Sequence, residues 1–294
     1  MVNKIKAKKK PHNKDHRLVW FLLPSLSGLL LFYLIPFVMS LGYTMVDNTT
    51  SQNFAGFQNF MDTFHNPLFL RALGNTLLFI ALCVPLNMIV SFLLAAGLKK
   101  KIRGRGIFSL IFLLPLVIPS GSVIYLWDCL FRLEGVMNRF LLDNGKTLVN
   151  WSESSAVMFI VVLLFVWKNA GYNMLLFWAG LGMIPEEYLD CAKVEGAGAW
   201  QTFRHVTLIY LSPTTFLVLL MSIINTFKSF REIYLLFGAN PNKHIYMLQH
   251  YMNNLYQSLN LPRLTTASYI LTFVITIMIF ALFMAQKKLS DHFS

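Results

Sequence analysis

The side chains best placed to do chemistry lie in one short polar insert of an otherwise apolar chain, EEYLDCAKVEGAGAWQTFRHVTL, residues 186–208. It carries four carboxylates, at Glu186, Glu187, Asp190 and Glu195. A membrane enzyme would need a nucleophile with a base, or a metal cluster, near one membrane face, and the sequence has no H-E-x-x-H or G-x-S-x-G pattern. The sequence therefore predicts no catalytic residue, and the carboxylates need another explanation.

Metal binding is the second chemistry to consider. His244 and His250 stand in one connection between apolar runs, but no third ligand of suitable spacing accompanies them. The three cysteines form no C-x-x-C pair, which argues against a thiolate site and a disulfide framework. We expect no metal and no cofactor bound by this chain.

The polar insert has the pattern of two short helices joined at a glycine. Pro185 suits a first helical position, because the N–H that proline lacks has no partner there. Glu186 and Glu187 follow in the first turn, where the helix dipole favours negative charge. The helix should end near Gly196, since glycine readily adopts the left-handed conformation of a C-terminal cap. A second helix should begin near Ala199 and run on into the next apolar run.

Each of these helices should present one apolar side. Tyr188, Leu189 and Ala192 share a face by three- and four-residue spacing, and Trp200 and Phe203 share a side of the second helix. Such an element can lie in the membrane interface or dock a cytoplasmic protein. The acidic first helix favours docking, because an anionic leaflet repels it.

The rest of the chain is apolar enough for a bilayer. Charged residues make up 13% of it, against about 25% in soluble domains. The net charge is +12, but the basic residues gather at the ends of apolar runs and not on one folded face. This pattern is typical of contact with anionic lipid and argues against nucleic acid as a partner.

Six apolar runs can cross a bilayer core of about 30 Å, which predicts an all-α integral membrane protein. Residues 1–17 form a basic tail, residues 18–286 a six-span domain and residues 287–294 a second tail. The first run is too long for the apolar part of a signal peptide, so we expect it to be a retained span. Prolines inside the runs predict kinks, at Pro36, Pro85, Pro115 and Pro119. The expected spans are about 18–45, 72–98, 107–131, 155–181, 206–230 and 265–286.

Lysine and arginine predict the orientation. The first tail holds seven of them and the connection 99–106 holds five. The positive-inside rule then places both termini in the cytoplasm, in agreement with an even number of spans. The connection 182–205, which contains most of the polar insert, should be cytoplasmic too.

Polar side chains inside the spans are candidates for a solute path. Lys168 lies near the middle of its span, where a charge costs roughly 2.5–3.5 kcal/mol on insertion scales and usually faces an interior or a water-filled path. It could pair with a group of a partner subunit or line the path. Tyr172 and Asn173 could stack on and hydrogen-bond a sugar, or join helices to one another. The path candidates are Lys168, Asn169, Tyr172, Asn173 and Asn225.

The polar insert resembles the EAA loop of permease subunits of ATP-binding-cassette (ABC) importers. That pattern reads E-A-A, three residues, G, nine residues, I-x-L-P. Here D-C-A at 190–192 stands at the E-A-A positions, Gly196 follows at the family's spacing, and Val206 and Leu208 replace the I and the L. Ile209 stands where the family has proline, which puts the angle into the next span in doubt.

The flanking sequence resembles the sugar-importer branch of these permeases, whose members resemble the maltose and glycerol-phosphate systems. The stretches that carry this resemblance are GYNMLLFWAGLGMIPEEYLDCAKVEGAGAWQTFRHVTL, LLPSLSGLLLFYLIPF, FAGFQNF and FLLPLVIPS. The resemblance implies the type I ABC importer permease fold in a bacterial cell (inner) membrane. It implies a second permease subunit, with a heterodimer favoured, a cytoplasmic ATPase dimer, and an extracellular or periplasmic solute-binding protein.

By the same resemblance the insert couples the chain to the ATPase. The chain has no Walker A pattern, so ATP and Mg would be bound, and ATP hydrolysed, by the separate subunit, and this chain is not expected to be an enzyme. The resemblance assigns coupling to Glu186, Glu187, Tyr188, Asp190, Ala192, Glu195, Gly196 and Ala197.

The expected function is half of an import pathway for a carbohydrate, with an oligosaccharide favoured. An acidic saccharide or glycerol phosphate is the alternative cargo, which Lys168, Lys228 and Arg231 would suit. A self-contained secondary transporter or channel is the alternative class. It would usually show broken helices or charges in several spans, and it needs no acidic loop with a glycine hinge.

Overall fold

The computed structural model describes residues 16–47, 53–99 and 104–292. Most of the basic tail and of the basic connection after residue 99 fall outside these ranges. Within them the chain is helical, with one isolated antiparallel bridge between Val46 and Phe54. The helices, including two π-helical stretches, are α1 (His16–Leu29), η1 (Leu30–Leu34), α2 (Ile35–Thr44), α3 (Gln58–His65), α4 (Pro67–Lys99), α5 (Arg105–Val117), α6 (Ser120–Phe131), α7 (Val136–Asp143), α8 (Val157–Gly182), α9 (Glu186–Val194), α10 (Ala199–Thr202), η2 (Phe203–Thr207), α11 (Leu208–Tyr210), α12 (Ser212–Lys228), α13 (Phe230–Phe237), α14 (Leu248–Gln257) and α15 (Leu261–His292).

Five of the described helical stretches are long and apolar enough to cross a membrane, and a bent pair makes up to six. Four of them agree with the predicted spans to within a few residues, at Phe21–Thr44, Pro67–Lys99, Val157–Gly182 and Leu261–Lys287. The fifth differs, because it covers Ser212–Phe237 where the sequence predicted 206–230. Residues 203–210 form η2 and α11, and a proline in the first turn of α12, Pro213, marks where the span begins.

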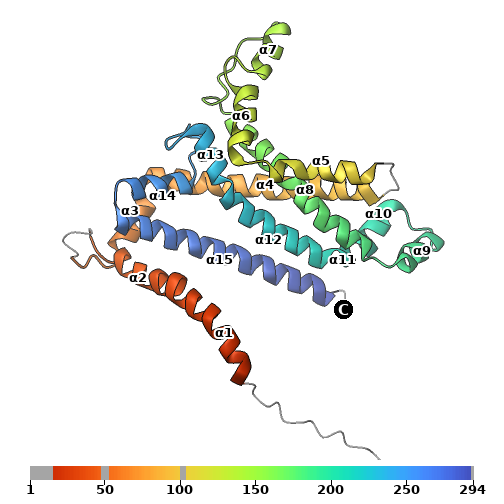
Figure 1. The fold of residues 1–294 in the computed structure, drawn as a ribbon, viewed down its shortest axis with the longest axis horizontal. Helices are drawn as coiled ribbons and strands as arrows, with labels where there is room; N and C mark the ends of the chain where they lie inside the picture. The colour runs from red at the N-terminus through yellow and green to blue at the C-terminus, as the bar shows by residue number, and fades with distance from the viewer. Residues whose placement is uncertain (1–15, 48–52, 100–103, 293–294) are drawn as a thin grey trace, which may run out of the picture.

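The third predicted span, 107–131, is not one kinked helix. Helix α5 ends at Val117, and the segment from Ser120 to Asp143 leaves it at an angle of 96°. Ile118, the residue before Pro119, is extended (φ −63°, ψ 131°), because the proline ring disfavours helical backbone at the residue before it. Helices α6 and α7 therefore project from the bundle as a separate arm (Figure 1).

The centre of the bundle is the pair α4 and α8, with α5 and α12 packed on α8. Glycines permit two close crossings. A Cβ on Gly171 would lie 1.9 Å from the backbone oxygen of Phe112, and one on Gly180 would lie 2.6 Å from Thr214 Oγ1. Small residues at such crossings are typical of membrane helices, which gain stability from close backbone packing.

The bundle has two distinct ends. Helices α9 and α10 lie at one end, here called the insert end, and α3 and α14 lie at the far end (Figure 1). The C-terminal end of α15 points toward the insert end. The first span leaves the bundle, and none of the residues in its most apolar window is buried. Helix α2 is held by Tyr269 of α15, whose ring centroid is 4.9 Å from that of Phe37.

Candidate functional site

The first helix of the polar insert is α9, Glu186–Val194. Pro185 directly precedes the helix and is not its first residue as predicted, a difference of one residue at a helix end. Glu186 and Glu187 occupy the first turn, as the sequence predicted. Their charges there complement the positive end of the helix dipole.

Gly196 ends this helix in the left-handed conformation that the sequence predicted, with φ +73°. The Gly196 N–H donates to the Lys193 oxygen (3.0 Å) and the Ala197 N–H donates to the Ala192 oxygen (2.9 Å). These two bonds are a Schellman cap, which satisfies carbonyls that the helix end leaves free. Apart from its chain neighbours, no atom of the described residues lies within 4 Å of a Cβ built on Gly196, so the backbone conformation alone explains the glycine.

The chain restarts as a helix three residues after Gly196. The Gly198 N–H donates to Gln201 Oε1 at 2.9 Å, and α10 begins at Ala199 as predicted. Helix α10 continues through η2 and α11 to the start of α12. The insert is therefore a helical hairpin that joins the insert ends of α8 and α12.

Apolar side chains fasten the hairpin to the bundle. Ala192 is buried, and Leu189 and Val206 pack against the cluster that contains Leu181 and Leu211. The ring of Phe203 lies 5.4 Å from that of Phe92 on α4, measured between centroids. These contacts fix the base of the hairpin against three helices.

The opposite side of the hairpin is open. Val194 is 88% exposed and Trp200 is 70% exposed, although both are apolar. Asp190 pairs with Lys193 at 2.7 Å, and this hydrogen bond raises the pKa of the lysine. The other three carboxylates have no ion-pair partner among the described residues. Exposed apolar side chains surrounded by exposed charged ones are typical of a surface that binds another protein.

Two basic residues hold the insert end of α8, and sequence reasoning had used them only to set topology. Lys99 Nζ donates to the Leu181 oxygen at 3.3 Å. The Arg105 guanidinium lies 4.1 Å from the ring centroid of Trp178. Cations at a helix C-terminus are favourable, so both groups stabilise the helix end from which the insert departs.

Lys168 forms an ion pair with Glu232 of α13, and its partner thus lies within this chain. The same carboxylate oxygen accepts a hydrogen bond from Ser120 Oγ at 2.8 Å. Sequence reasoning missed Glu232, because it ended span five at residue 230. An acidic residue close after an apolar run was the signal that could have found it.

The other predicted path residues have different surroundings. Asn169 is buried and donates to the Phe165 oxygen at 2.8 Å, within its own helix. Asn173 is buried and donates to Ser222 Oγ at 2.8 Å. Tyr172 and Asn225 are half-buried. The structure thus brings Asn173 to span five but does not bring the five predicted residues together at one cavity.

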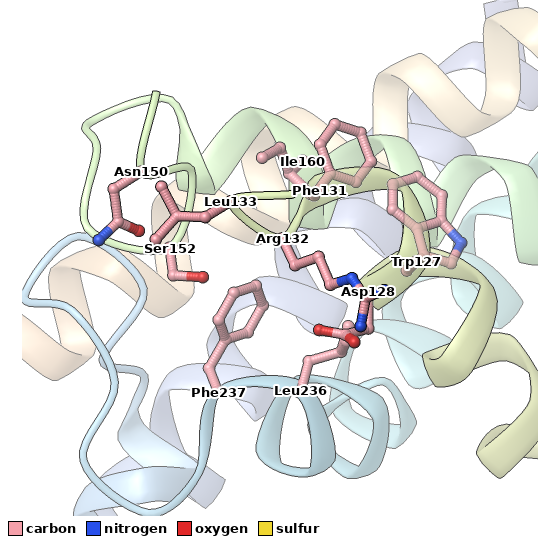
Figure 2. A pocket seen from close by; sticks show the side chains of 10 residues that line it. All are labelled: Trp127, Asp128, Phe131, Arg132, Leu133, Asn150, Ser152, Ile160, Leu236 and Phe237. Carbon is pink, nitrogen blue, oxygen red and sulfur yellow. The ribbon is translucent and has the colours of Figure 1, made fainter. Parts of the chain in front are cut away.

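A cavity of about 180 Å³ lies beside the C-terminal end of α6, between α6, α8 and α13 (Figure 2). Its lining mixes aromatic rings with charged and amide groups, and none of the predicted path residues belongs to it. The lining residues are Trp127, Asp128, Phe131, Arg132, Leu133, Asn150, Ser152, Ile160, Leu236 and Phe237.

The two histidines considered as metal ligands differ in burial. His250 is fully buried, and its Nδ1 accepts a hydrogen bond from the Met247 N–H at 3.2 Å, while His244 is exposed. Within the described part of the chain, no group of three or more His, Cys, Asp or Glu side chains could hold a metal ion.

Solved structures share this fold. A bacterial ABC transporter involved in the import of the acidic polysaccharide alginate matches with a TM-score of 0.80 and 24% identity, over 92% of this chain and 95% of that one. The same score is found for the alginate transporter in complex with its alginate pentasaccharide-bound periplasmic protein, at 22% identity. The fold is that of an ABC importer permease.

Sequence comparisons define the family. A glycerol-3-phosphate transport system permease protein of Yersinia enterocolitica is 32% identical over 209 residues, 70% of this chain and 71% of that one. Probable ABC transporter permease y4oQ of Sinorhizobium fredii is 29% identical over 267 residues, 88% and 86% of the two chains. The family model "binding-protein-dependent transport system inner membrane component" matches residues 69–293, and the chain belongs to this family. It is a multi-pass permease component, as the sequence predicted.

Proposed function

We propose that this chain forms half of the translocation pathway of an ATP-driven carbohydrate importer and that its helical hairpin docks on a separate ATPase. The observation that carries the proposal is the hairpin itself. It is fastened at its base by Leu189 and Phe203, capped by its own backbone at Gly196, and leaves Trp200 and Val194 exposed. A rigid element with an open apolar face needs a partner to cover it.

The partners follow from this reading. A second permease subunit, with a heterodimer favoured, completes the pathway, and a cytoplasmic ATPase dimer binds ATP and Mg. A solute-binding protein delivers the cargo on the opposite side. The insert end then faces the cytoplasm of a bacterial cell, together with both termini, and the far end faces outward.

The cargo we propose is an oligosaccharide, and an acidic one or glycerol phosphate is the alternative. Support comes from the relatives, one of which transports glycerol-3-phosphate and another alginate according to their names. Tyr172 and Asn225 are the proposed solute contacts whose side chains make no hydrogen bond among the described residues. Lys168, Asn169 and Asn173 are bonded within the chain and would contact solute only after those bonds rearrange.

A mild-detergent purification of the tagged chain from its own membranes tests the proposal. We expect a second six-span subunit and an ATPase to accompany it, with a solute-binding protein held more loosely. The ligand of that binding protein would then identify the cargo. A chain that purifies alone with an intact insert would support the self-contained transporter instead.

A further inference from the structure

Three helices meet at one buried charged cluster, here called the joint: Lys168 of α8, Glu232 of α13 and Ser120 of α6. The Lys168 and Glu232 side chains are 16% and 5% exposed. Glu232 Oε1 accepts from both the lysine ammonium and the serine hydroxyl. Ser120 is the first residue of α6, so the joint lies where the broken third span resumes.

Stability alone does not explain a buried ion pair. The desolvation of two charges can exceed their attraction, and apolar replacements of such pairs are often neutral or stabilising. A buried pair does give a directional contact that holds only one arrangement of its helices. Ser120 constrains the arrangement further. Its hydroxyl donates to the same carboxylate oxygen of Glu232, which holds the first residue of the arm against α13.

Lys168 stands on α8, which the insert joins to α12, and Glu232 stands on α13, which follows α12. Helix α8 runs directly into the insert, and α12 with α13 follows it. Lys168 lies 14 positions before Gly182, the last residue of α8, which is about 21 Å of helix at 1.5 Å per residue. The arm also follows α5 in the chain, and α5 packs on α8. Near the joint, Val123 and Trp127 of α6 pack on Ile160 and Leu164 of α8.

We propose that the joint transmits movement of the insert to the arm α6–α7, so that Lys168, Glu232 and Ser120 act as positioning residues for transport. This inference rests on the proposed coupling of the insert to an ATPase. When the insert moves, α8 and α13 move with it as two rigid helices. Because Lys168 and Ser120 bond to the same oxygen of Glu232, the arm should move with α8 and α13 together and not with either helix alone.

The test uses the whole transporter in liposomes and counts solute imported per ATP hydrolysed. The double variant Lys168→Met/Glu232→Gln removes both charges and leaves neither unpaired. We expect it to assemble with its partners and hydrolyse ATP, but to import at least about tenfold less solute per ATP, the scale of losing a hydrogen bond to a charged group. The matched control is Lys146→Met/Glu134→Gln, two exposed charges that keep the stoichiometry unchanged.

A second measurement follows the arm itself. Spin labels at Phe140→Cys and Phe159→Cys, both more than half exposed, report the distance between α7 and α8 in a chain whose three native cysteines are replaced. We expect ATP analogues to change this distance in the otherwise wild-type chain and not in the double variant. If the double variant does not assemble, Ser120→Ala keeps the ion pair and should lower the stoichiometry about three- to tenfold.

Normal stoichiometry and a normal distance change in the double variant would overturn the inference while leaving the proposed function intact. Normal values in an assembled Ser120→Ala variant would overturn the part played by the arm. A wild-type complex without ATP-dependent uptake would overturn the proposed function, and the inference with it.

Discussion

The polar insert and the far connection, residues 238–260, both join one span to the next, but they satisfy their polar groups in opposite ways. The insert bonds mainly to itself, through the cap at Gly196 and the bond from the Gly198 N–H to Gln201. The far connection bonds to α4. Asn75 Nδ2 donates to the backbone oxygens of Lys243 (2.8 Å) and Tyr246 (2.9 Å).

Burial differs in the same way. In the far connection Ile245, Met247 and Leu248 are almost fully buried, and the Leu248 N–H donates to Thr76 Oγ1 at 2.9 Å. In the insert Val194 and Trp200 stay exposed. The apolar side chains of the far connection are thus buried by other parts of the same chain. In the insert, the backbone hydrogen bonds are made but apolar side chains stay exposed. The insert is therefore suited to binding a partner and moving with it.

The largest expected effect is on the insert backbone. Gly196→Pro should abolish uptake, because proline cannot adopt φ +73° and lacks the N–H that bonds Lys193. The bundle should still insert and fold, since no side chain in the described part of the chain packs on this residue. Uptake in cells and the folded yield in detergent measure the two effects separately.

Gly196→Ala is the graded control for this change. It keeps the N–H and should cost about 1–2 kcal/mol for the left-handed conformation, with partial loss of uptake. Normal uptake by the proline variant would contradict the coupling role of the insert.

Substitutions in the far connection should change the stability of the fold, whereas those in the insert should change uptake. Leu248→Ala removes a side chain with no exposed surface and should lower the free energy of unfolding by about 2–5 kcal/mol. Tyr256→Ala, on an exposed position of the same helix, should change it little. Thermal unfolding in detergent compares the two variants, and equal unfolding temperatures would show that the connection is not held as the structure describes.

Acid should also act on the far connection. Burial lowers the pKa of His250 to about 4, from 6.5 for a free histidine. The folded chain therefore binds fewer protons than the unfolded chain between these values, so stability is full above pH 6.5 and falls as the pH drops toward 4. We expect a loss of up to about 3 kcal/mol over this range.

Chemical unfolding at several pH values measures this loss. His250→Gln keeps an acceptor for the Met247 N–H but does not titrate, so its stability should depend less on pH. The same slope in both chains would assign the pH dependence to other groups.

The smallest of these effects concerns the open face of the insert. Trp200→Ala should leave stability unchanged, because the side chain is 70% exposed. It should weaken binding of the purified ATPase about tenfold, the scale of a modest interface anchor. Titration of the ATPase onto the chain in nanodiscs measures this, and Trp200→Phe should retain most of the affinity. Unchanged affinity in the alanine variant would place the docking surface elsewhere.

Sequence reasoning was most successful where the deciding contacts are local. Glycine at 196, the acidic first turn at Glu186 and Glu187, and the restart at Ala199 all depend on bonds that reach at most five residues along the chain. Apolar runs likewise predicted most of the spans, because each helix satisfies its own backbone in lipid. The family resemblance, which rests on the same insert, was confirmed by the family match.

Contacts between distant residues could not be obtained in this way. The sequence identified Lys168 as exceptional, but its partner stands 64 positions away on α13, in a segment that the apolar pattern left outside the span. Pro119 predicted a kink, yet the 96° turn depends on what the arm packs against after the break, namely α13 and the apolar side chains of α8. Local bonds decide where helices begin and end, and only packing between helices decides which buried charges meet.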